Sequence, residues 1–111
     1  MIEDTIKAIE ARIQAADAIK DDRQRRELLE LLANLKSEVV GLSQTHEEQA
    51  QSIARFTELS AAEATRGQRN PQLLELSLEG LSTSVSEFEK SHPKLTQVVN
   101  AISNLLANLG I

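Results

Sequence analysis

The chain has 111 residues, of which 41% are hydrophobic and 26% are charged, and it contains no Cys, Trp or Tyr. These counts exclude disulfides, a thiol nucleophile and thiolate zinc sites, and two phenylalanines give little material for stacking bases or sugar rings. The formal net charge of −5 disfavours nucleic acid and anionic membrane surfaces as partners.

The first predicted helix covers about residues 2–20. Its isoleucines follow the four-three spacing of an amphipathic helix, and they are Ile2, Ile6, Ile9 and Ile13. Charged residues interrupt the segment, so it does not resemble a signal peptide, and no apolar run approaches the ~18 residues of a membrane span. We therefore expect a cytoplasmic protein that does not contact membranes.

The second predicted helix covers about residues 22–66. Asp21 or Asp22 can cap its start, and Arg66-Gly67 is typical of a helix end. Apolar residues recur at alternating steps of four and three from Leu28 onward, and polar residues take several of these positions nearer Gly67. A capping-box spacing at Thr45-His46-Glu47-Glu48 marks a possible break, which we interpret as a kink.

The third predicted helix covers about residues 71–109, with Asn70 as the N-cap and Pro71 as the first helical residue. The four-three spacing runs from Leu74 to Leu109 without a change of register. Pro93 removes one helical hydrogen bond within this segment. Because the register continues across Pro93, we predict a kink there and not a reversal.

Together these segments predict an all-α single domain over residues 1–111. Helices of roughly 66 and 60 Å would pair as an antiparallel, coiled-coil-like hairpin, on which the short first helix packs. The alternative is a compact bundle of five helices, with breaks near residues 41–45 and 91–93 taken as true ends. The absence of alternating strand patterns supports the all-helical class in both cases.

The hairpin brings the only two histidines to the same level. They belong to a candidate polar layer whose members are His46, Gln49, Glu89 and His92. Such a layer fixes helix register in coiled coils, which is the interpretation we favour. Two alternatives remain open, a pH-responsive pair and a metal site, although the repeated Glu-x-x-His pattern of di-metal bundles is missing. We predict no metal and no cofactor.

Two apolar faces remain for partners. The half of the hairpin near Gly67 leaves Leu59, Leu73 and Leu76 uncovered, and the isoleucines Ile2, Ile6, Ile9 and Ile13 form the other candidate face. There is no Gly-x-Ser-x-Gly elbow and no Gly-rich phosphate loop. We therefore predict a non-enzymatic interaction or scaffolding module that self-associates through its heptad seams, as a dimer above all, or binds a helical partner.

The C-terminal part carries a recognisable string, Phe88-Glu89-Lys90-Ser91-His92-Pro93, and ends in Gly110-Ile111. This signature resembles a family of short bacterial proteins classed as a domain of unknown function. The resemblance implies a small helical protein without an assigned activity, and it transfers no catalytic residue.

Overall fold

The computed structural model describes residues 1–109 as an all-helical protein, and no strand occurs within that range. The predicted all-α class is confirmed. The helices are α1 (Ile2–Ala15), α2 (Asp22–Ser43), α3 (Glu47–Ala64), α4 (Pro71–Ser86) and α5 (Pro93–Asn108). None of these helices is long and apolar enough to cross a membrane.

Two helices begin where the sequence predicts, because polar side chains satisfy their free amides. Asp21 Oδ1 accepts a hydrogen bond from the Arg23 amide at 2.8 Å at the start of α2. At the start of α4, Asn70 Oδ1 accepts from the amides of Gln72 and Leu73 at 3.1 and 3.2 Å, and Pro71 supplies a first residue with no amide to satisfy.

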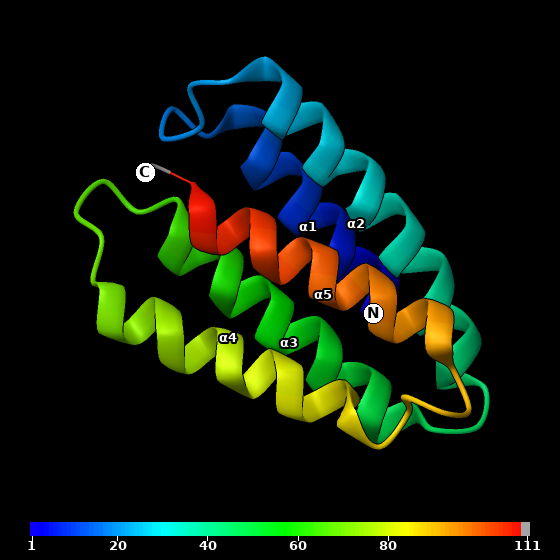
Figure 1. Cartoon of the computed structure of the whole chain (residues 1–111). Coiled ribbons are helices and arrows are strands. Elements are labelled where there is room, and N and C mark those ends of the chain that lie inside the picture. The colour runs from blue at the N-terminus through cyan, green and yellow to red at the C-terminus, as the bar shows by residue number, and fades with distance from the viewer. Residues whose placement is uncertain (110–111) are drawn as a thin grey trace.

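The two long predicted helices are wrong, and the five-helix alternative is correct. The chain leaves its helical path between Ser43 and Glu47 and again between Ser86 and Pro93. Both breaks reverse the chain direction instead of kinking it (Figure 1). The largest dimension of the molecule is therefore 37 Å, well short of a 66 Å hairpin. The first helix is also shorter than predicted and ends at Ala15.

Helices α2, α3, α4 and α5 form an antiparallel four-helix bundle, in which each helix packs on the next and α5 returns to pack on α2. Helix α1 lies outside this ring and packs on both α2 and α3. The α2–α3 and α4–α5 turns lie at the same end of the bundle, and the longer α3–α4 connection lies at the other (Figure 1).

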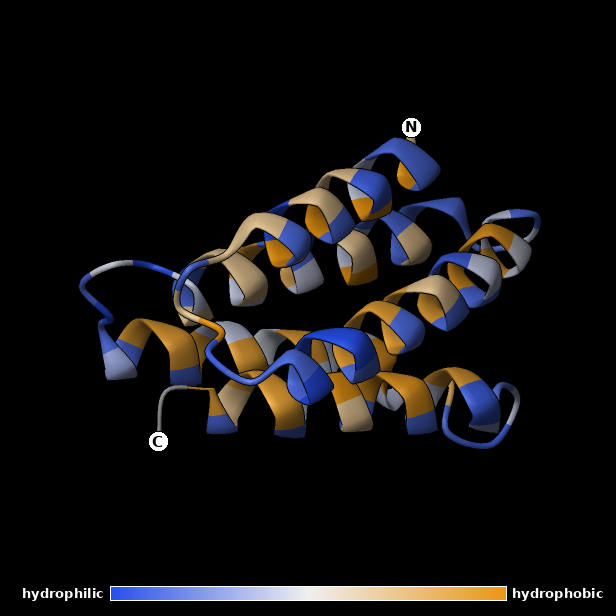
Figure 2. Cartoon of the chain, turned by 90° about the horizontal axis from the view of Figure 1, so that it is seen from above, coloured by the Kyte–Doolittle hydropathy of each residue, from blue (hydrophilic) through white to orange (hydrophobic). Residues whose placement is uncertain are grey.

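One continuous core joins the five helices. Apolar positions face the neighbouring helices and polar positions face outward (Figure 2). Fully buried side chains come from every helix, and examples are Ile9, Leu35, Ile53, Leu81 and Ile102. The four-three seams that suggested a coiled coil are thus covered by the bundle itself.

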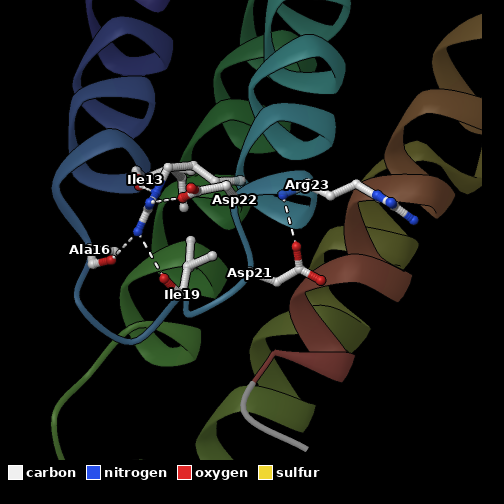
Figure 3. Close-up of polar contacts among 7 residues, drawn as sticks. Ile13, Ala16, Ile19, Asp21, Asp22 and Arg23 are labelled. Carbon is white, nitrogen blue, oxygen red and sulfur yellow. Dashed lines mark hydrogen bonds and ion pairs between the residues drawn. The ribbon is translucent and has the colours of Figure 1, made fainter.

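Arg25 holds the turn between α1 and α2 through contacts with Ile13, Ala16 and Ile19, which Figure 3 labels. Its guanidinium donates hydrogen bonds to three backbone carbonyls, those of Ile13, Ala16 and Ile19, at 3.2, 2.7 and 2.8 Å. Its Nη1 atom also lies 3.1 Å from Asp22 Oδ1. Because the last carbonyls of a helix have no partner within the helix, Arg25 satisfies the end of α1 and fixes α1 to α2.

Candidate functional site

The two histidines occupy equivalent positions in the two turns at one end of the bundle. His46 immediately precedes α3 with φ −136° and ψ 62°, and His92 immediately precedes α5 with φ −137° and ψ 66°. Each backbone amide donates to the carbonyl four residues earlier, that of Leu42 or Phe88, at 2.8 Å. The two turns therefore share one backbone design.

The side chains repeat this equivalence. The Nδ1 atom of His46 lies 2.8 Å from the Thr45 hydroxyl, and that of His92 lies 3.0 Å from the Ser91 hydroxyl. The two imidazole centroids are 6.4 Å apart. The Phe88 ring lies 5.3 Å from His46 and 5.5 Å from His92, and all three pairs meet edge to face. We call these three rings the histidine cluster.

The other two members of the predicted polar layer lie elsewhere. Gln49 is half-buried on α3 and lines the groove between α3 and α4. Glu89 is exposed in the turn after α4. Within residues 1–109, no hydrogen bond or ion pair joins either of them to a histidine. The structure thus replaces the predicted four-residue layer with two histidines and Phe88.

A metal site at the histidines lacks ligands. In the described part of the chain, no group of three or more His, Asp or Glu side chains is close enough to hold a metal ion. Two imidazoles alone fall short of the three or four protein ligands that zinc sites use. The pH-responsive interpretation of His46 and His92 stays a prediction.

The isoleucine face predicted for partners is mostly wrong. Ile6, Ile9 and Ile13 are at most 2% exposed, and Ile2 is half-buried against the same core. The reason is that α1 packs on both α2 and α3 and turns this face inward. These isoleucines stabilise the fold and are not free to bind a partner.

The three leucines predicted to be uncovered are exposed, with fractions of 46% for Leu59, 42% for Leu73 and 54% for Leu76. Leu76 lines the groove between α3 and α4 together with Phe56. Leu59 follows Phe56 by three residues and Leu73 precedes Leu76 by three, so both lie on the groove side of their helices. We call Leu59, Leu73 and Leu76 the leucine surface.

A second groove, between α4 and α5, was missed by the sequence reasoning. Its cavity volume is about 770 Å³, and Leu74, Leu78 and Ala107 give it an apolar floor. A continuous helix through Pro93 would not have formed it, because α4 and α5 then would not pack on each other. The signal available in the sequence was a repeat of 46 residues that relates Leu42 and His46 to Phe88 and His92.

Comparisons with known proteins give one match. The model of the family described as Domain of unknown function (DUF4404) matches residues 25–111, which include all of α3 to α5 and α2 from its fourth residue onward, and leaves α1 outside. No curated protein matches the chain, and no solved structure matches it. Gly110 and Ile111, the end of the predicted signature, lie outside the residues that the structure describes. Because the match covers most of its length, the chain belongs to the DUF4404 family.

Proposed function

We propose that the protein is a non-catalytic, cytoplasmic interaction module that pairs with a second copy of itself through the leucine surface. The observation that carries this proposal is the distribution of exposed apolar side chains. Within residues 1–109 the exposed large hydrophobic residues are Met1, Leu59, Leu73 and Leu76. Single exposed leucines are common on protein surfaces, but here three of the four belong to one packed helix pair.

The surroundings of the leucine surface resemble those of a protein contact. The groove beside Leu76 has the Phe56 ring as an apolar member, and Ser52, Thr83 and Ser84 with the carboxylates Glu79 and Glu87 supply a polar border. An apolar centre with a polar rim is the usual composition of an interface. Helices α3 and α4 are 18 and 16 residues long, which is enough for a helix-against-helix contact between two copies.

Sedimentation equilibrium tests this proposal. We expect the wild-type chain to have twice its 12.2 kDa monomer mass, and the variant Leu73→Glu with Leu76→Glu to have the monomer mass. Both residues are exposed, so the charged variant should keep the helical circular dichroism of the wild type. The matched control is Gln72→Glu with Ser82→Glu, which adds the same charge to exposed positions of α4 and should remain dimeric.

Two results would contradict the proposal. One is a wild-type chain that stays at 12.2 kDa up to ~1 mM, where even a weak pair of about −4 kcal/mol associates. The other is a dimer that both double variants leave intact, which would locate the contact away from the leucine surface.

A further inference from the structure

The molecule contains two helical hairpins related by the 46-residue repeat, α2–α3 and α4–α5. The repeat matches buried residues to buried residues: Leu28 to Leu74, Leu35 to Leu81, Val39 to Val85, Leu42 to Phe88 and Ile53 to Val99. The turns agree as well, since His46 and His92 have the same backbone angles and the same side-chain partners. The two hairpins are therefore structural counterparts.

The first hairpin has a helix in its outer groove. Helix α1 is held there by Arg25, which bonds the carbonyls at its end, and by Lys36, whose Nζ lies 3.3 Å from Glu10 Oε1. Leu32 lies between Arg25 and Lys36 on the same side of α2 and is 1% exposed. Ala61 of α3 is also 1% exposed.

The corresponding positions of the second hairpin line the α4–α5 groove. Pro71, Leu78 and Ser82 are the counterparts of Arg25, Leu32 and Lys36, and all three belong to the groove lining. Ala107, the counterpart of Ala61, lies across from them on α5. Leu78 is half-buried and Ala107 is exposed, whereas their counterparts are fully buried. The second groove therefore corresponds to the groove that α1 fills in the first hairpin, but within residues 1–109 no helix covers it.

The edge of the second groove differs from the first in charge. Glu75 and Glu79 stand where the first hairpin has Leu29 and Ala33, and Arg69 belongs to the same lining, where its Nη1 atom donates to the Leu109 carbonyl. Ser82 replaces Lys36, so the cation that pairs with Glu10 of α1 has no counterpart. An acidic border on a chain of net charge −5 attracts basic residues and disfavours the acidic flank that α1 presents.

We propose that the α4–α5 groove binds a basic amphipathic helix from a partner protein. The helix carries aliphatic residues at the four-three spacing of α1, which fill the floor formed by Leu74, Leu78 and Ala107. Lysine or arginine on its flanks pairs with Glu75 and Glu79. The proposed self-association uses Leu59, Leu73 and Leu76, none of which lines the α4–α5 groove, so this inference stands independently of it; within residues 1–109, Glu79 is the one residue that lines both grooves.

Fluorescence anisotropy with two labelled peptides and the full-length chain tests the proposal. The native peptide is residues 1–20 of this chain, in which four acidic and three basic side chains nearly balance. The basic peptide is the same segment with Glu3, Asp4 and Glu10 changed to lysine. We expect the basic peptide to bind, and the native one to bind about tenfold more weakly because it lacks the added lysines that pair with Glu75 and Glu79.

Variants of the full-length chain locate the binding site. Ser82→Trp fills the groove from an exposed position, and Glu75→Lys with Glu79→Lys reverses its edge. Each change should weaken binding of the basic peptide about tenfold or more. Glu27→Lys on α2 is the charge control, and Leu76→Glu on the leucine surface is the second control; both should leave the affinity unchanged.

Three outcomes would overturn the proposal. The first is no binding of the basic peptide at ~1 mM. The second is binding that Ser82→Trp and the charge reversal do not weaken. The third would come from an NMR titration with the basic peptide. Amide chemical-shift changes confined to α2 and α3 would mean that the peptide displaces α1. None of these outcomes alters the mass measured for the leucine-surface variants, so the two proposals fail separately.

Discussion

The ring of Phe56 on α3 occupies the space where a side chain at position 80 of α4 would begin. Three ring atoms of Phe56 lie within contact distance of the site that a Cβ on Gly80 would take, two of them far too close for a real Cβ. Gly80 is helical and half-buried, so glycine is required at this position because it leaves space, and not because it allows an unusual backbone angle. The absence of a side chain at Gly80 therefore sets how closely α3 and α4 approach.

We predict that Gly80→Ala lowers the free energy of unfolding by about 1–3 kcal/mol, because the added methyl group displaces the Phe56 ring. This net loss comes despite the better helix propensity of alanine. The control is Gly41→Ala in α2, where, within residues 1–109, no atom beyond the neighbouring residues and the backbone of the helix itself lies within 4 Å of the new Cβ. That variant should gain about 0.4–1 kcal/mol. Urea denaturation followed by circular dichroism measures both, and equal stabilities would contradict the close contact.

Arg25→Ala should lower the free energy of unfolding by about 2–3 kcal/mol, since it removes charged hydrogen bonds to three carbonyls at the end of α1 and in the turn. Arg25→Lys should recover only part of this loss, because an ammonium group lacks the planar fork. Arg26 is exposed on the same helix, and Arg26→Ala should change stability by less than about 0.5 kcal/mol. Hydrogen exchange of the α1 amides should rise in the Arg25 variants alone; unchanged exchange would be evidence against this role.

Ser60→Ala should stabilise the protein by about 1 kcal/mol. Ser60 is fully buried on α3, and within residues 1–109 its hydroxyl has no hydrogen-bond partner. Ser77 is a matched control, because it is equally buried but donates to the Leu74 carbonyl at 2.8 Å. Ser77→Ala should be neutral or slightly destabilising. Thermal melts distinguish the two, and a lower melting temperature for Ser60→Ala would show that the hydroxyl is bonded after all.

A double-mutant cycle tests the histidine cluster. The changes His46→Asn and His92→Asn put a residue favoured at helix N-caps in both N-cap positions and remove the rings that lie 6.4 Å apart. We expect a coupling energy of about 0.5–1 kcal/mol between them. His46→Asn paired with Gln72→Ala, at the far end of the bundle, should be additive. Additivity of the two histidine changes would mean that their rings do not stabilise each other.

Several elements could be predicted from the sequence because their signals are local. Asp21 and Asn70 cap helices through bonds to amides two or three residues away, so residue type and position suffice to place these starts. The exposure of Leu59, Leu73 and Leu76 also followed from the pattern, since each lies off the main apolar seam.

The direction of the chain at Thr45 and Pro93 could not be predicted from periodicity. The inward faces of short antiparallel helices have the same four-three spacing as a long coiled coil, so an unbroken register is compatible with a reversal. The local signals, a capping-box spacing from Thr45 to Glu48 and a proline after His92, marked both breaks, although the N-cap of α3 is His46 and not Thr45.

Of the candidate sites, too, one part could be predicted from the sequence and another part could not. A hairpin was expected to bring the two histidines together, and they do meet, but through two equivalent turns and with Phe88 as the third ring. The burial of Ile6, Ile9 and Ile13 depends on where α1 lies in three dimensions. No spacing along the chain indicates that placement.

The scarcity of aromatic residues has a spectroscopic consequence. Phe56 and Phe88 are the only phenylalanines, and there is no Trp or Tyr. Phe56 lies in the α3–α4 groove and Phe88 in the histidine cluster. Carbon-13 labelling of phenylalanine therefore yields two sets of ring signals, one from the α3–α4 groove and one from the turns. A tryptophan introduced at any position would be the sole fluorophore of the chain.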